Sequence, residues 1–476
     1  MINTVKKKIM QNPVLFCFIF IFILYVIPTF LQVTFDENLQ ITKFYFGLPG
    51  ILSGDEPHYF VTTTSLINDH DFYIENNYDN AYFYGACDVG FHFVNNTNPQ
   101  VGRHMMLYDE ENKVVTTINE KNEYNASTYS QASFQQIPAR PLGLPLFSAF
   151  LLWPLKDTCF IEAGAIYVSI FVSLIGVFFF YLICRYYAKK YIQEQERREQ
   201  LSLLFTLLFA LCTQFWHYSK TYFTEPYFTT FLLVAYYFFF IEERKIRSSF
   251  IPGFILGIGF TMKDPFGMYL LLFVVLLVWA KQWKRLFLFV AGSTAPVLWI
   301  LFYNWILTGS IFTFGRATSY LGLLGDTFFG IFASFFHPTF GIIPFAPFLI
   351  FAFLGFHALY KLNKKCFYEI LLLVVPYTLL WASLSLTDVG AGGAYSGRYL
   401  IVILPFLVLL CFFWYIQNKN LFLMKIFFVF AILSFIINAQ AAFFYPLFWN
   451  NPPWIIFSKL ITKGDRLIEI IRESLW

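Results

Sequence analysis

The stretch SGDEPHYF, residues 53–60, holds a pair of carboxylates, Asp55 and Glu56, directly before Pro57. A carboxylate held in a fixed position can accept a proton from a hydroxyl group, ligate a metal ion or cap a helix. A helix fits this stretch, because Pro57 suits the first helical position and HYFVTTTSLIND would continue the helix. The stretch alone leaves all three roles open.

Three cations stand out at the ends of apolar segments: Arg140 in ARPLG, Lys263 in TMKDPFG and Arg398 in AYSGRY. An Arg side chain can bind a phosphate through two parallel hydrogen bonds, and a Lys side chain can bind it as a point charge. Lys263 and Arg398 could equally be snorkelling at the ends of membrane segments. The run GAGGAYSG, which contains Tyr395, lets the backbone before Arg398 approach a ligand closely.

Other polar residues also have two interpretations. His58 and Tyr59 follow the acidic pair and could line a site or simply pack. His337 precedes a proline in FFHPTFG, where a turn histidine is common. Lys220 and Glu225 flank one turn and could pair with each other.

Motifs for nucleotides and metals are weak. The sequence has no Gly-rich phosphate loop, no CxxC pair and no Cys/His metal pattern. Asp69 and Asp71 form a DxD pattern, which a polar turn explains as well as a metal site does. We therefore expect no cofactor and assign no metal site, although a divalent metal is compatible with the acidic pair. Cys87 and Cys159 could face the same side and form a disulfide.

The composition places these residues in a membrane protein. Hydrophobic residues make up 58% of the 476 and charged residues only 13%, with a mean hydropathy of +0.59. Apolar runs of about 20 residues recur along the chain, and each is long enough to cross a bilayer. The sequence thus predicts an all-α polytopic membrane protein, and the small net charge of +4 gives no indication of a nucleic-acid partner.

We predict one membrane-embedded domain over residues 1–476 with about eleven crossings. The predicted crossings are 13–34, 160–184, 201–217, 226–241, 250–262, 266–280, 286–307, 341–360, 366–386, 398–416 and 421–445.

The distribution of basic residues predicts the orientation. Of the 33 Lys and Arg residues, 19 fall at the N-terminus and in the short connections that would share its side. Short basic loops face the cytoplasm, so the N-terminus should lie inside and the C-terminus outside. Residues 35–155 then form a long first extracytoplasmic loop, with 141–155 as an interfacial or re-entrant segment. Residues 446–476 form an extracytoplasmic tail, which ends in a sequence typical of an amphipathic interfacial helix.

Several segments resemble those of one family. SGDEPHYFVTTTSLINDHDFYIENNY resembles the acidic first outer loop of GT-C glycosyltransferases, within the superfamily of protein mannosyltransferases and the lipid A aminoarabinose transferase. ARPLGLPLF, GFTMKDPFGMYLLL, NWILTGSIF, FFHPTFGIIPFAPF and GAGGAYSGRYLIVILPF resemble later segments of that group, in the same order.

The resemblance implies a GT-C-like fold and an activity. Such an enzyme of the bacterial cytoplasmic membrane transfers a sugar, with inversion, from a polyprenyl-phosphate carrier to an extracytoplasmic glycan, lipid or protein. It places the general base on Asp55, with Glu56 as second choice or helper. The donor phosphate would be bound by Arg398, Lys263 and Arg140, and His58, Tyr59, His337 and Tyr395 would line the substrate site.

Three other classes remain open. A polyprenyl-linked lipid or glycan transporter, or flippase, would be expected to have mid-membrane charges and an internal repeat, neither of which is evident. A non-enzymatic assembly partner would leave the carboxylates and cations on one face unexplained. A metal-dependent oligosaccharyl transferase relative would normally add a soluble C-terminal domain.

Overall fold

The computed structural model describes most of the membrane-embedded part of the chain. The described residues are 12–35, 41–46, 56–72, 105–108, 114–118, 135–138, 141–156, 158, 160–242, 249–308, 311, 327–383, 396–444 and 453.

Among the described residues, six helical segments are long and apolar enough to cross a membrane, which makes the chain a multi-pass helical membrane protein. They are α2 (Pro13–Val26) with the 3₁₀ turn Ile27–Phe30, α7 (Ile161–Tyr191), α13 (Trp283–Thr308), α17 (Lys364–Ala382), the 3₁₀ helix η9 (Arg398–Ile403) continued by α19 (Leu404–Gln417), and α20 (Leu421–Phe444).

The other five predicted crossings also coincide with helices, but these are shorter or more polar. They are α8 (Gln195–Leu211), α10 (Glu225–Tyr236) with the π-helical turn Tyr237–Ile241, α11 (Phe250–Met262), α12 (Gly267–Trp279), and α15 (Ile342–Phe345) followed by η8 (Pro347–Ile350) and α16 (Phe351–Leu362). The structure therefore supports six membrane spans by length and composition, against about eleven predicted.

Several helices begin or end away from the predicted boundaries of the crossings. Helix α7 continues to Tyr191, well beyond the predicted end at 184, because a helix need not stop where the apolar run stops. The first crossing is shorter than predicted, since its helical part ends at Phe30. The predicted outer loop 308–340 contains a helix, α14 (Thr327–Phe336).

The all-α prediction also missed five short strands, all between residues 31 and 138. Strand β1 (Leu31–Phe35) pairs antiparallel with β2 (Ile41–Phe46). Strand β3 (Met105–Tyr108) lies between β4 (Val114–Ile118) and β5 (Gln135–Pro138), also antiparallel. Aromatic and β-branched residues favour β1, β2 and β4, but every one of the five strands is too short for its pattern to stand out in a polar loop.

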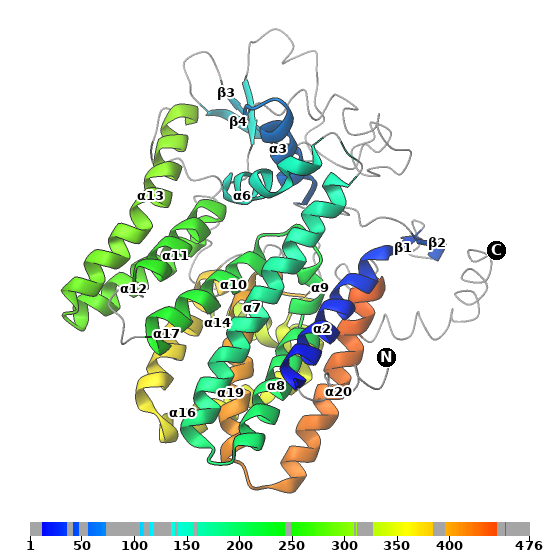
Figure 1. The fold of residues 1–476 in the computed structure, drawn as a ribbon, viewed down its shortest axis with the longest axis vertical. Helices are drawn as coiled ribbons and strands as arrows, with labels where there is room; N and C mark the ends of the chain where they lie inside the picture. Colours follow the sequence, from blue (N-terminus) through cyan, green and yellow to red (C-terminus); the bar gives the residue numbers. More distant parts are fainter. Residues whose placement is uncertain are drawn as a thin grey trace.

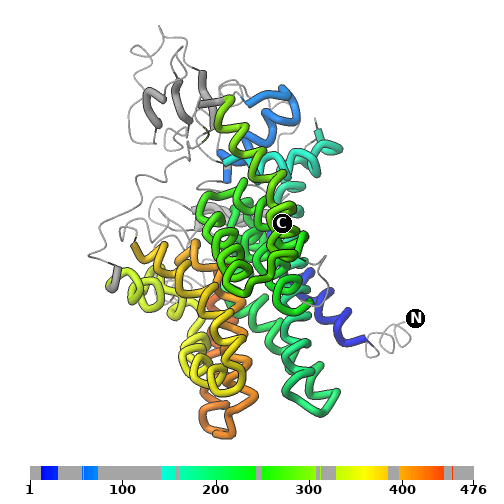
Figure 2. The backbone as a smooth tube through the Cα atoms, turned by 90° about the vertical axis from the view of Figure 1, so that its left-hand side faces the viewer, coloured from blue at the N-terminus to red at the C-terminus, as the bar shows by residue number. Residues whose placement is uncertain are grey.

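The described elements are arranged with two distinct ends. Helices α3 (Glu56–Asn68) and α6 (Gly143–Leu152) lie at one end together with β3 and β4, which we call the loop end (Figure 1). The short α7–α8 and α19–α20 connections lie at the opposite end, which we call the turn end (Figures 1 and 2).

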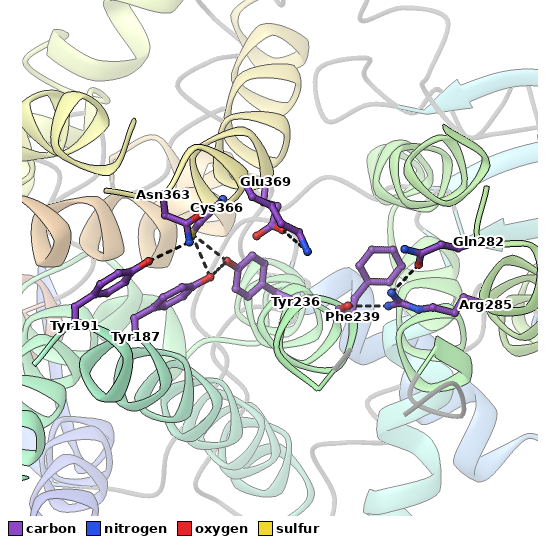
Figure 3. Close-up of polar contacts among 10 residues, drawn as sticks. Tyr187, Tyr191, Tyr236, Phe239, Gln282, Arg285, Asn363, Cys366 and Glu369 are labelled. Atoms are coloured by element: carbon purple, nitrogen blue, oxygen red, sulfur yellow. Dashed lines mark hydrogen bonds and ion pairs between the residues drawn. The ribbon is translucent and has the colours of Figure 1, made fainter. Parts of the chain in front are cut away.

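Hydrogen bonds hold the turn end together. The Tyr187 and Tyr236 hydroxyl groups lie 2.7 Å apart, and the Cys366 thiol donates to Tyr187 over 3.1 Å (Figure 3). The Asn363 amide donates to the Tyr191 hydroxyl group over 3.0 Å. These contacts join the ends of α7 and α10 to the start of α17.

Candidate functional site

Helix α3 carries the acidic stretch into the interior of the loop end. The helix begins at Glu56, so Pro57 is its second residue rather than its first. Glu56 is buried, and its Oε1 accepts a hydrogen bond from the backbone N–H of Tyr222. The Thr63 hydroxyl group lies 2.9 Å from the Tyr222 hydroxyl group. Two residues of α3 therefore hold the turn that separates α9 (Phe215–Ser219) from α10.

A lysine in the same turn lies in the field of Glu56. Burial lowers the pKa of the Lys220 ammonium group to about 8, and the negative charge of Glu56 partly offsets this effect. Pairing of Lys220 with Glu225 was one interpretation of the sequence; in the structure Glu225 forms ion pairs with Lys263 and Arg398.

Glu225, at the start of α10, contacts both cations of the site. Its Oε1 lies 2.7 Å from the Lys263 Nζ and 3.4 Å from the Arg398 Nε. The exposed fractions are 1% for Glu225, 4% for Arg398 and 17% for Lys263. We call these three residues the ion-pair cluster. With one carboxylate and two cations, the cluster carries a net charge of +1, so an anion could still be attracted to it.

Aromatic rings surround the two cations. The Lys263 Nζ lies 4.2 Å from the centre of the Tyr399 ring, which stacks on Trp381 at 3.9 Å. The Arg398 guanidinium group lies 4.5 Å from the Phe223 ring and donates to the Tyr399 hydroxyl group over 3.2 Å. Cation–π contacts of this kind stabilise a partly desolvated charge. The rings therefore hold both cations in place without neutralising them.

Close backbone contacts position Lys263. It lies between α11 and the 3₁₀ turn Asp264–Phe266, in an extended conformation. Gly143, at the start of α6, approaches so closely that a Cβ atom there would lie 2.5 Å from the Met262 backbone nitrogen. Burial raises the pKa of the neighbouring Asp264 carboxyl group to about 6, despite the opposing effect of Lys263.

The structure brings together some of the predicted site residues. Lys263 and Arg398 meet on Glu225, and Glu56 reaches the same region through the 220–225 turn. His58 and Tyr59 are buried on α3, and Tyr59 belongs to the main hydrophobic core.

His337 occupies a local turn. It stacks on Phe340 at 3.7 Å, and its Nδ1 lies 2.9 Å from the Thr339 hydroxyl group. Asp55, Arg140 and Tyr395 lie outside the described residues, as do Cys87 and Cys159.

Sequence reasoning missed the central role of Glu225, but a signal was present. Glu225 and Pro226 open α10 in the run EPYF, as Glu56 and Pro57 open α3 in EPHYF. Each glutamate is the first residue of a buried helix at the loop end and meets groups from distant parts of the chain.

An apolar pocket of about 290 Å³ lies between α14, α16, α17 and α19. Its wall on α17 includes Thr378 and Leu379, within one helical turn of Trp381, whose partner ring Tyr399 contacts Lys263. The pocket and the ion-pair cluster are therefore linked through a short stretch of α17.

Within the described ranges, no three His, Cys, Asp or Glu side chains are grouped as metal ligands would be. No known protein family matches the chain, and no curated protein matches it either.

Proposed function

We propose that the chain is an inverting glycosyltransferase that moves a sugar from a polyprenyl-phosphate carrier to an acceptor outside the cytoplasm. The observation that carries this proposal is the meeting of Lys263 and Arg398, from segments far apart in the sequence, at one end of a membrane bundle. Two partly desolvated cations suit a phosphate, and the apolar pocket nearby on α17 suits a prenyl chain. The acceptor would be a glycan, a lipid or a protein of the bacterial cell envelope.

The proposed reaction needs few groups. An acceptor hydroxyl oxygen forms a bond to the anomeric carbon, and the bond from that carbon to the phosphate oxygen breaks. The electron pair leaves with the phosphate, where Lys263 and Arg398 stabilise the developing charge. The hydroxyl proton passes to a carboxylate, a contribution worth roughly 10²–10⁴-fold in rate. Because phosphate is a good leaving group, no general acid is required.

Asp55 is the better of the two candidate bases. The Oε1 of Glu56 already accepts the Tyr222 backbone N–H, and Glu56 lies in the field of Lys220. These contacts commit Glu56 to holding the 220–225 turn. We therefore assign proton transfer to Asp55 and the positioning of that turn to Glu56.

Binding of the carrier tests the proposal without knowledge of the sugar. Purified protein should bind polyprenyl phosphate and discriminate against the uncharged polyprenol, as measured by native mass spectrometry in detergent. Arg398→Lys keeps the charge but loses the two parallel hydrogen bonds that a guanidinium group can donate to phosphate. The affinity for polyprenyl phosphate should therefore fall about tenfold, and Arg398→Gln should weaken binding further. Equal binding of the alcohol and the phosphate would contradict the proposed donor site.

Turnover tests the base. With a panel of polyprenyl-phosphate sugars, the wild type should release polyprenyl phosphate when supplied with envelope acceptors. Asp55→Asn should reduce release by roughly two orders of magnitude or more while carrier binding persists, because Asn cannot accept the proton. A fully active Asp55→Asn variant would exclude Asp55 as the base. Movement of the carrier lipid across vesicles without release of polyprenyl phosphate would instead indicate a transporter.

A further inference from the structure

Gln214 joins three segments at the loop end. It lies in the break between α8 and α9, with only 2% of its surface exposed. Its Nε2 donates to the Ile342 backbone oxygen over 3.0 Å and to the Ser396 Oγ over 3.2 Å. One amide thus connects the α8–α9 break, the start of α15 and the turn that leads into Arg398.

That turn has a demanding backbone conformation. Ser396 has a φ of 57°, in the left-handed region that a serine rarely adopts. Gly397 follows with φ −69° and ψ 76°, and the Arg398 N–H donates to the Ser396 backbone oxygen over 2.8 Å. These values describe an inverse γ-turn, after which η9 begins at Arg398. The direction in which Arg398 leaves the backbone therefore depends on Ser396 remaining left-handed.

Within the described ranges, two side-chain hydrogen bonds hold Ser396 there. Besides the bond from Gln214, its hydroxyl group donates to the Gly341 backbone oxygen at 3.5 Å, the limit of a hydrogen bond. The Oε1 of Gln214 is buried and has no hydrogen-bond partner in the described part of the chain. A buried amide with only one half satisfied is costly. An apolar residue at position 214 would avoid the cost of burying an amide. The presence of glutamine therefore indicates that its hydrogen bonds to Ile342 and Ser396 have a role.

We propose that Gln214 is a positioning residue that holds the Ser396 turn so that the Arg398 guanidinium group faces the carrier phosphate. This inference rests on the proposed function for its ligand, but its effect on Arg398 can be measured without any ligand. Gln214 acts through the turn and does not itself touch the phosphate.

The experiment compares Gln214→Leu with a matched control, Gln417→Leu. The Gln417 amide donates to the Ala358 backbone oxygen over 2.9 Å and belongs to the turn end, away from Arg398. Three quantities are measured in detergent for each variant: the melting temperature, the affinity for polyprenyl phosphate, and modification of Arg398 by phenylglyoxal, quantified by peptide mass spectrometry.

We expect both variants to melt at lower temperature. Only Gln214→Leu should increase the modification of Arg398 severalfold and weaken polyprenyl phosphate binding about tenfold. Ser396→Ala should behave like Gln214→Leu, because it removes the hydroxyl group and keeps the unfavourable backbone conformation. Ser396→Gly should have a smaller effect, because glycine adopts a positive φ without support.

Each outcome has one meaning. If Gln214→Leu only lowers the melting temperature, and leaves Arg398 modification and carrier affinity within twofold of the wild type, Gln214 is merely structural and the inference is wrong. If the wild type does not bind polyprenyl phosphate, the proposed function fails, and phenylglyoxal modification alone decides whether Gln214 positions Arg398.

Discussion

Glu225 presents one carboxylate oxygen to two cations in a nearly water-free setting. The attraction within such a group has to offset the cost of removing three charges from water. Removing one member of a buried pair commonly costs about 3–5 kcal/mol, because the remaining charge stays buried without compensation. The ion-pair cluster therefore stabilises the loop end only while all its members are present.

We expect Glu225→Gln to lower the free energy of unfolding by about 3 kcal/mol. Thermal unfolding in detergent measures this effect. Adding Lys263→Met should restore part of the loss, because it removes one of the two uncompensated cations. The control is Lys365→Met. Lys365 is 69% exposed and lies 3.9 Å from Glu369, so its removal should change stability by well under 1 kcal/mol. Equal effects of Glu225→Gln and Lys365→Met would contradict this account of the cluster.

Asp264 gives a pH-dependent test beside the same cluster. Burial raises its pKa to about 6, whereas the unfolded chain titrates near 4. Between these values the folded state holds more protons, so stability falls as pH rises from 4 to 6, and the cost persists at pH 7. Asp264→Asn removes the cost of ionising this buried carboxyl group. The substitution should therefore stabilise the fold by up to about 2 kcal/mol at pH 7 and hardly at all at pH 4.

Melting temperatures at the two pH values test this prediction for Asp264. The exposed Glu194→Gln in the α7–α8 connection serves as the control and should be nearly neutral at both. A gain from Asp264→Asn that is the same at pH 4 and pH 7 would show that its cause is not ionisation.

Among the elements, α11 and α13 pack closely against each other through two glycines. A Cβ atom on Gly253 would lie 2.0 Å from the Phe289 backbone oxygen, and one on Gly292 would lie 2.3 Å from that of Phe250. Helices in a membrane associate through such close packing, because lipid supplies little hydrophobic drive between them. Lys263 directly follows α11, so the packing of this helix pair sets where the lysine lies.

We expect Gly253→Val to separate α11 from α13 and displace Lys263 from Glu225. The variant should lose thermal stability, and the protein that remains folded should bind polyprenyl phosphate more weakly. Gly267→Ala is the control, since the atoms nearest to the added methyl group belong to the Phe260 ring, which can shift. Wild-type stability of Gly253→Val would mean that the two helices do not need this contact.

The helices were predictable because apolar length alone marks a membrane segment, and each predicted crossing coincides with a helix. The strands could not be predicted, because strands of four to six residues in a polar loop depend on partners elsewhere in the chain. Lys263 and Arg398 were identified as cations of interest. Their meeting on Glu225 could not be read from the sequence, since the Lys263 partner lies 38 positions away and is reached only by folding.

Over the whole molecule, exposed aromatic residues and basic connections bear on the orientation in the membrane. Trp279 is 82% exposed beside the α12–α13 connection, and Phe150 on α6 is 82% exposed at the loop end. Aromatic residues favour the membrane–water boundary, so these positions are suited to the two interfaces. The turn end gathers short basic connections, which the positive-inside rule assigns to the cytoplasm.

We therefore expect the loop end to face outward, and single cysteines test this orientation. In a chain with Cys87 and Cys159 replaced by serine, His70→Cys should react with an impermeant maleimide added to intact cells. Glu194→Cys and Asn418→Cys, in the α7–α8 and α19–α20 connections, should react only after the membrane is permeabilised. The remaining described cysteines are buried and should contribute little background. The opposite labelling pattern would place the ion-pair cluster in the cytoplasm, where no extracytoplasmic acceptor could reach it, and the proposed function would fail with the orientation.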